Sequence, residues 1–169
     1  MKSILPLLLL ICSNAFAQKL TIKKTVDKMD GEVYYSASKG LKAVKDAKKW
    51  FLIEPIIKKN EEDKVECTGL FIKFSGIGAC NQNDVLDFLF EDGSRLQIKA
   101  WNQFGCKSNS GFFIDSTNAL GECLTSIKLL NKAVKSIRFS NGRTHDNLTV
   151  DLPLKDRNYF VELNEALGN

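Results

Sequence analysis

Apolar and polar side chains alternate along much of this 169-residue chain. In residues 86–90 (LDFLF) leucine and phenylalanine occupy every second position, and residues 96–100 (LQIKA) repeat the pattern after Asp92-Gly93. Alternation with a period of two on both sides of Asp-Gly predicts a β-hairpin, because glycine accepts the positive φ that tight turns require.

Four further regions show strand patterns. Residues 19–26 and 31–37 form a predicted pair around Asp30-Gly31, and residues 70–74 alternate before the flexible stretch 75–78. Residues 137–139 and 148–152 predict a second hairpin, whose connection runs from about Asn141 to Asp146. The apolar run 50–57 predicts a well-buried strand, with Pro55 marking a sheet edge or a bulge.

Two segments change to a helical period. In residues 118–131 the apolar positions 120, 124, 127 and 130 recur three or four residues apart, which predicts a helix. Near the end, Asp156 can cap a helix that carries Phe160, Leu163 and Leu167 on one face and stops at Gly168. A final strand over 159–163 is the alternative.

Together these elements predict a mainly β, α+β domain. The expected architecture is an antiparallel β-sandwich or a partly open barrel with one or two covering helices. No internal repeat or low-complexity linker divides the chain, and the charged stretch 58–64 is typical of a solvated loop.

The N-terminus has the pattern of a secretory signal peptide. Lys2 is followed by the apolar run 4–11 and by Ala15-Phe16-Ala17, which has small residues where a signal peptidase cuts. We therefore predict a signal peptide over 1–17 and a single secreted β-rich domain over 18–169, located in the periplasm or outside the cell. Lipidation at Cys12 is the alternative, although Ile11 is larger than the residue that a lipoprotein signal places there. No later window approaches the roughly 20 apolar residues of a membrane-spanning helix, so we do not expect the chain to be an integral membrane protein.

The composition is that of a globular protein, with 44% hydrophobic and 26% charged residues. The chain has 24 basic and 20 acidic residues, a balance too weak to indicate a nucleic-acid partner. The lysines are concentrated in residues 19–59, which contain 11 lysines and five acidic residues. They either protect sheet edges and loops or form a patch that attracts an acidic partner.

Four cysteines lie beyond the predicted signal: Cys67, Cys80, Cys106 and Cys123. An even number in an exported chain predicts two disulfides, for which three pairings are possible. Short loops favour the neighbours, Cys67 with Cys80 and Cys106 with Cys123. No spacing is C-x-x-C and the chain has one histidine, so we predict neither a metal site nor a cofactor.

Motifs that carry chemistry are absent from the sequence: it has no nucleophile elbow, P-loop or zinc-protease helix. His145 is the one candidate for general acid–base catalysis. Its neighbour Asp146 follows directly and is expected to point elsewhere, so we interpret His145 as an exposed turn residue.

Exposed aromatic and basic residues offer a candidate contact surface. If Leu96 and Ile98 face inward, then Arg95, Lys99 and Trp101 face outward, and Tyr34 is expected to be exposed. Tryptophan and tyrosine bury large areas at low entropic cost, which is why they dominate many interfaces. These four residues are the predicted binding residues.

The opening around Asp27 and Gly31-Glu32, the segment Phe90-Glu-Asp-Gly-Ser94 and the segment Lys135-Ser-Ile-Arg-Phe139 resemble a loose group of small exported bacterial proteins without an assigned activity. The resemblance implies a bacterial, exported, β-rich domain. It transfers no functional residue.

Two classes of function follow. The preferred prediction is a non-catalytic module that binds an envelope or extracellular protein or polymer, and it requires an exposed aromatic or basic patch. The alternative is a small secreted hydrolase or isomerase that uses His145 or carboxylates gathered across strands, and it requires a polar pocket around them.

Overall fold

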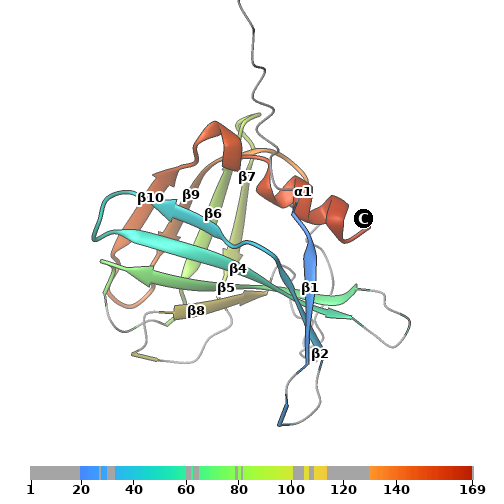
Figure 1. Cartoon of the computed structure of the whole chain (residues 1–169). Helices are drawn as coiled ribbons and strands as arrows, with labels where there is room; N and C mark the ends of the chain where they lie inside the picture. Colours follow the sequence, from blue (N-terminus) through green and yellow to red (C-terminus); the bar gives the residue numbers. More distant parts are fainter. Residues whose placement is uncertain are drawn as a thin grey trace, which may run out of the picture.

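The computed structural model describes residues 20–26, 28–29, 33–59, 62, 65–78, 80, 82–100, 105–106, 109–113 and 130–168. Within these residues the chain forms two antiparallel sheets and one short C-terminal helix (Figure 1). These two sheets and the helix confirm the predicted mainly β, α+β class. Within the described residues the sheets do not close into a barrel.

The larger sheet, which we call sheet 1, has six strands in the order β1-β2-β4-β5-β8, with β3 also paired to β4. Its long central strands are β4 (Trp50–Lys59) and β5 (Val65–Ser75). The remaining strands are β1 (Ile22–Val26), β2 (Val33–Ala37), β3 (Leu41–Val44) and β8 (Asn109–Phe113).

The smaller sheet, sheet 2, has the order β10-β9-β6-β7. Its strands are β6 (Val85–Phe90), β7 (Arg95–Lys99), β9 (Val134–Ser140) and β10 (Asn147–Asp151). Both predicted hairpins lie in this sheet, and the strands of the two sheets cross one another in Figure 1. Gly93 has φ +83° at the first turn, and the second connection spans residues 141–146 as expected.

Sheet 1 contains a break opposite Pro55. Ser36 of β2 pairs with Ile56, whereas β3 resumes its pairing with Leu41 opposite Ile53. The β2–β3 side therefore has two more residues than the β4 side, and the excess lies around Ser38 to Gly40. Proline has no N–H to donate and sits beside this interruption. Pro55 thus marks a bulge-like break inside the sheet and not a sheet edge.

The hydrophobic core lies between the two sheets. The inward positions of β4, Phe51, Ile53 and Ile57, are fully buried. Phe74 of β5 and Phe139 of β9 join the sheets, with their ring centroids 4.7 Å apart. Alternation places these side chains on one face of each strand, which is the physical basis of the sequence pattern.

A short helix, α1 (Tyr159–Ala166), covers one end of the core after the 3-10 turn η2 (Leu154–Asp156). Phe160 is fully buried and meets Phe88 of β6 edge to face at 5.4 Å. The predicted C-terminal helix is confirmed, and the alternative strand is wrong. The prediction that Asp156 caps this helix is wrong, because Asp156 lies in the 3-10 turn, where its N–H donates to the carbonyl of Pro153. The N-cap residue is Asn158.

One disulfide joins Cys80 to Cys106. The predicted pairing of neighbouring cysteines is therefore wrong. Loop-closure entropy grows only with the logarithm of loop length, so a loop about twice as long costs roughly 0.6 kcal/mol more. Packing of the folded chain brings residues 80 and 106 together, and so small a difference in loop-closure free energy does not decide the pairing.

Several predictions lie outside the described residues. They are the signal peptide, most of the helix over 118–131, Cys123, Trp101 and the turn residues Asp30 and Gly31. Among the helices that the structure does describe, none has the length and apolar character needed to cross a membrane.

Candidate binding surfaces

His145 lies in the connection between β9 and β10 and is exposed to solvent, with φ +61°. Its backbone N–H donates to the carbonyl of Asn141 at 3.0 Å. The carboxylate of Asp146 accepts the N–H of Gly78 at 3.4 Å, so it serves the neighbouring loop. His145 lines none of the three cavities described below.

The side chain of Asn141 holds this connection in place. Its side-chain amide donates to the carbonyl of Cys80 at 3.0 Å, and its side-chain oxygen accepts the N–H groups of Arg143 and Thr144. The next residue, Gly142, donates to the buried carboxylate of Asp84 at 3.1 Å. The connection therefore clamps the loop that carries the disulfide, which is a structural task.

Two of the four predicted binding residues, Arg95 and Lys99, have side chains within the described part of the chain. Arg95 and Lys99 are exposed on the outer side of β7, as the alternation predicts. Tyr34 belongs to β2 of sheet 1, paired with Thr25, and its side chain is outside the described part. Trp101 is not described at all.

The outer face of sheet 2 is a polar network around Asp87. Arg138 donates to this carboxylate from Nε and from Nη2 at 2.9 and 2.8 Å, and Gln97 donates to its other oxygen at 2.8 Å. A shallow hollow of about 150 Å³ lies beside the network. Arg138 and Asp87 neutralise each other, whereas Arg95 and Lys99 remain exposed on the same face.

The outer face of sheet 1 is different, because it is apolar as well as basic. On β4 the positions that alternate with the buried Phe51 and Ile53 are Trp50, Leu52 and Ile56, and they point outward. Ile56 is 44% exposed. A strand that is apolar on both sides is typical of burial on both faces. The sequence predicted such a strand over 50–57 but did not predict that one side would be open.

Lysines lie over the aromatic rings of this face. The Lys42 ammonium is 5.7 Å from the Trp50 ring centroid, and the Lys73 ammonium is 5.8 Å from that of Phe71. Lys73 also pairs with Glu54 at 2.8 Å. We define the outer face of sheet 1 by these side chains together with exposed Val44, namely Lys42, Val44, Trp50, Leu52, Glu54, Ile56, Phe71 and Lys73.

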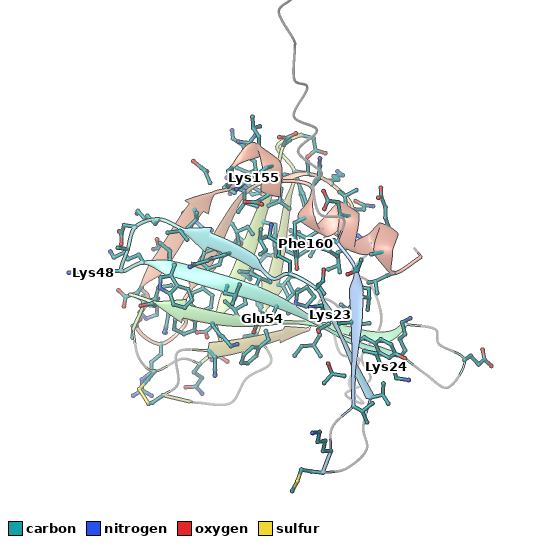
Figure 2. The ribbon with its side chains drawn as sticks, viewed as in Figure 1. Lys23, Lys24, Lys48, Glu54, Lys155 and Phe160 are labelled. Atoms are coloured by element: carbon teal, nitrogen blue, oxygen red, sulfur yellow. A yellow bond between two sulfur atoms is a disulfide. The ribbon has the colours of Figure 1, made fainter. Side chains whose placement is uncertain are left out.

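The β3–β4 hairpin extends the positive charge beyond the sheet. Lys45, Lys48 and Lys49 are exposed there, and Figure 2 shows the Lys48 side chain pointing away from the sheets. Asp46 cancels one of these three charges, and its carboxylate folds back onto the turn. It accepts the N–H groups of Lys48 and Lys49 at 2.8 and 2.9 Å, which lowers the pKa of Asp46.

A hollow of about 310 Å³ opens on the outer face of sheet 1 at the β2–β3 break. Ala37, Pro55, Ile56 and Phe71 give it apolar walls, and Ser36, Ser38 and Glu54 supply polar groups. The two extra residues of the break lie between the Ser36–Ile56 and Leu41–Ile53 pairs, beside this hollow. The hollow therefore follows from the local sheet irregularity beside Pro55.

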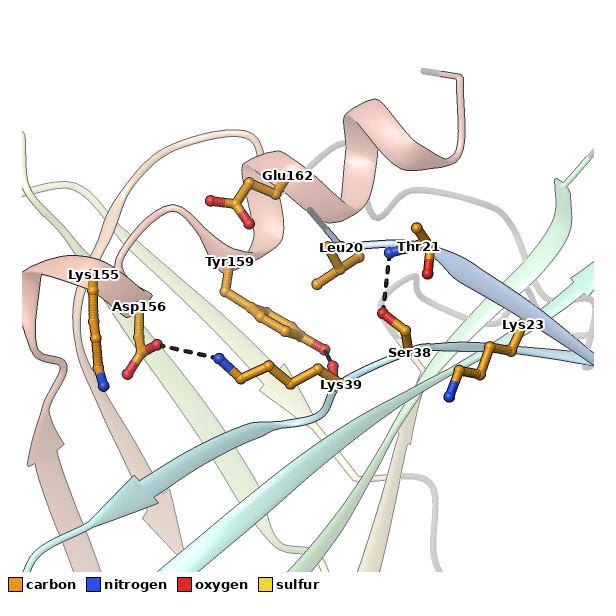
Figure 3. A pocket seen from close by; sticks show the side chains of 9 residues that line it. All are labelled: Leu20, Thr21, Lys23, Ser38, Lys39, Lys155, Asp156, Tyr159 and Glu162. Carbon is orange, nitrogen blue, oxygen red and sulfur yellow. Dashed lines mark hydrogen bonds and ion pairs between the residues drawn. The ribbon is translucent and has the colours of Figure 1, made fainter. Parts of the chain in front are cut away.

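A larger pocket, of about 440 Å³, lies between α1 and the first strands (Figure 3). The Tyr159 hydroxyl donates to the Lys39 carbonyl at 2.7 Å and ties the helix to the β2–β3 break. Burial, reinforced by the Glu54 carboxylate, raises the pKa of Tyr159. Its role is structural, because its proton is committed to a backbone carbonyl.

Charged side chains surround this pocket. Lys39 and Asp156 form a long ion pair at 3.9 Å. Lys23, Lys155 and Glu162 also line it. No ion pair joins these three residues to another described residue. Sequence analysis missed this site because its walls come from residues 20–23, 38–39 and 155–162, which no motif connects.

Among the described residues, no group of three or more histidine, cysteine, aspartate or glutamate side chains is arranged to hold a metal ion. Comparison with protein-family models, curated proteins and solved structures finds no significant match to this chain. The likeness to small exported bacterial proteins therefore stays a prediction.

Proposed function

We propose that this protein is an exported, non-catalytic binding module that docks an acidic protein segment on the outer face of sheet 1. One observation carries the proposal: β4 turns Trp50, Leu52 and Ile56 outward, where Ile56 remains 44% exposed. Exposed apolar residues that adjoin one another on a sheet face are typical of interaction sites.

The charge on this face specifies the sign of the partner. Lys42 and Lys73 lie among the apolar side chains, and Lys45, Lys48 and Lys49 continue the basic surface along the hairpin. Glu54 is paired with Lys73 and compensates only part of this charge. Positive surfaces speed association with acidic partners and exclude basic ones.

The arrangement of the rings favours a protein over a polysaccharide. Sugar rings bind by stacking on open aromatic faces, whereas the Trp50 and Phe71 rings have lysine ammonium groups above them. The hollow beside Pro55 has the size and apolar walls to take one aliphatic or aromatic side chain. Burial of such an anchor contributes about 1.5–3 kcal/mol, while each exposed lysine–carboxylate contact adds at most about 1 kcal/mol.

The test uses random peptides displayed on phage and selected on the oxidised mature protein. We expect selected peptides to be acidic and to contain one large apolar residue. Binding of one synthesised peptide, followed by fluorescence anisotropy, should weaken about tenfold or more in Ile56→Glu and up to about fivefold in Lys42→Glu. Lys99→Glu, on the outer face of sheet 2, is the matched control and should bind normally.

Circular dichroism and thermal unfolding will show whether each variant keeps the fold. Selected peptides without an acidic excess, or peptides that bind Ile56→Glu as tightly as wild type, would show that this face is not the docking surface. His145→Ala should leave peptide binding unchanged. Loss of binding in that variant would move the site to the β9–β10 connection.

Export is a separate part of the proposal and rests on the signal-peptide pattern of residues 1–17. Expression of the whole chain in a bacterium with an intact secretion system should yield a mature protein that begins at Gln18. Intact-mass measurement distinguishes this product from the uncleaved chain. A protein that stays in the cytoplasm with all 169 residues would contradict export without affecting the docking test.

A further inference from the structure

Asn141 and Gly142 form the one Asn-Gly pair in the sequence. Asparagine is chemically labile before glycine, because glycine has no side chain to hinder attack of its backbone nitrogen on the asparagine amide. In that reaction the Gly142 nitrogen loses its proton and bonds to Cγ of Asn141, a succinimide ring forms, and ammonia leaves. Water then opens the ring to aspartate or isoaspartate. The pair is therefore a candidate site of deamidation at the start of the β9–β10 connection.

We propose that Asn141 is a latent modification site, which the native fold protects and which deamidates when the loop that carries the Cys80–Cys106 disulfide opens. The inference does not depend on the proposed docking of a protein. It rests on the hydrogen bonds and the packing that hold both reacting groups.

The attacking atom, the backbone nitrogen of Gly142, is held by a carboxylate. Its N–H donates to Asp84 at 3.1 Å, and Asp84 is 0% exposed. A neighbouring carboxylate opposes loss of the proton, because two negative groups would then lie side by side. The backbone is also closely packed here, since a Cβ on Gly142 would overlap the backbone oxygens of Gln82 and Asn83. The rotation that closes a succinimide ring therefore has little room.

The group under attack, the side-chain amide of Asn141, is held on both of its polar atoms. Its nitrogen donates to the carbonyls of Cys80 and Gly78 at 3.0 and 3.5 Å. Its oxygen accepts the N–H groups of Arg143 and Thr144 at 2.9 and 3.0 Å. Asn141 is 1% exposed, so water has little access to protonate the departing ammonia. The native fold should therefore slow both formation of the ring and loss of ammonia.

The disulfide controls access to this site. The carbonyl that accepts the Asn141 amide belongs to Cys80, and Cys80 is bonded to Cys106. Loss of the disulfide releases the Cys80 loop and weakens the contact that keeps the amide in place. A local opening of this kind requires less free energy than global unfolding. Deamidation should therefore be faster in protein that lacks the disulfide.

The product cannot restore the native contacts. Aspartate at position 141 replaces the amide donor with a carboxylate oxygen that faces the Cys80 carbonyl. Isoaspartate adds a carbon to the backbone beside Gly142, where even a Cβ has no room. Because water does not return the ammonia, the change runs in one direction. A molecule whose loop has opened for long enough is therefore permanently altered.

The experiment compares three samples incubated at mildly alkaline pH: the oxidised protein, the double variant Cys80→Ser with Cys106→Ser, and a synthetic peptide of residues 136–150. Peptide mapping measures aspartate and isoaspartate at position 141. We expect the peptide to deamidate at least tenfold faster than the oxidised protein, and the double variant at least threefold faster. Asn147, an exposed asparagine followed by leucine, is the internal control and should stay unmodified in all samples.

A second measurement needs no variant. The rate in the oxidised wild type is followed at urea concentrations below the unfolding midpoint. Opening of one loop exposes little surface, so the rate should rise only slightly with urea, whereas global unfolding would make it rise with the full slope of the unfolding transition. That steep dependence, or equal rates in the peptide and the oxidised protein, would overturn the inference.

Discussion

The clamp formed by Asn141 provides the sharpest test of the fold, because one side chain joins the β9–β10 connection to the disulfide loop. Asn141 is 1% exposed. Its amide donates to the carbonyl of Cys80 at 3.0 Å, and its oxygen accepts from Arg143 and Thr144 at 2.9 and 3.0 Å. The amide also donates to the carbonyl of Gly78 at 3.5 Å, so replacing Asn141 with alanine removes four hydrogen bonds at once.

The four lost bonds do not cost the same amount, and the long contact to the Gly78 carbonyl contributes least. The N–H groups of Arg143 and Thr144 belong to exposed residues, so water replaces the asparagine oxygen and each loss costs about 0.5 kcal/mol. The Cys80 carbonyl lies in a partly buried position and loses a donor that water replaces poorly, which costs about 1–2 kcal/mol. We therefore expect Asn141→Ala to lower the free energy of unfolding by about 2–3 kcal/mol.

Urea unfolding of the oxidised protein, followed by fluorescence of Trp50 and Trp101, measures this change. With a typical dependence of about 2 kcal/mol per molar urea, the midpoint should fall by about 1–1.5 M. Asn141→Asp keeps the acceptor for the turn but turns a buried carboxylate oxygen toward the Cys80 carbonyl, so at neutral pH its loss should be at least as large as that of Asn141→Ala. Asn147→Ala, an exposed asparagine in the same hairpin, should change stability by no more than about 0.5 kcal/mol.

A loss below about 1 kcal/mol in Asn141→Ala would refute the clamp, because it would mean that the amide contacts contribute no more than a surface hydrogen bond. Equal losses in Asn141→Ala and Asn147→Ala would lead to the same conclusion. The connection would then be held by its backbone alone.

Three further predictions concern other parts of the fold. Replacing Cys80 and Cys106 together by serine should lower the free energy of unfolding by about 3.5 kcal/mol, the chain-entropy value for a 26-residue separation. Non-reducing peptide mapping of wild type should recover the Cys80–Cys106 link, and recovery of Cys80 linked to Cys67 would contradict the structure. Gly142→Ala should destabilise the fold by about 3 kcal/mol or more in thermal or urea unfolding, because a Cβ there would lie 2.3 Å from the backbone oxygen of Asn83. Near-wild-type stability would show that this loop can shift at little cost in free energy. Lys132 and Ser94 hold the pKa of Asp92 well below its usual range. Wild type should therefore be more stable than Asp92→Asn above about pH 4, and this difference in unfolding free energy should shrink as the pH falls through the lowered pKa. A difference that does not change with pH would exclude this linkage.

Local pattern was sufficient for much of sheet 2 and for the helix. Leu86, Phe88 and Phe90 alternate because β6 has one buried side, and the turn beside Gly93 needs the positive φ that glycine accepts. Phe160 and Leu163 recur at helical spacing because α1 buries one stripe against the sheets. In these elements the residues that determine the structure lie within a few positions of one another.

The candidate sites were only partly predictable for the same reason. Alternation correctly placed Arg95 and Lys99 on the exposed side of β7. It also showed that β4 is apolar at successive positions, but no local rule says whether the outward side of a strand meets another layer. That depends on where sheet 2 packs, and sheet 2 covers the side that contains Phe51 and Ile53.

The sequence by itself determined the class of fold, the two hairpins of sheet 2 and the C-terminal helix, because each depends on short-range periodicity and turn chemistry. Tertiary structure alone decided that Cys80 pairs with Cys106, that Trp50 faces outward and that Lys23, Lys39 and Lys155 surround one pocket. These outcomes depend on contacts between residues far apart in the chain. Burial of one shared core sets such contacts, and no single segment of the sequence contains that information.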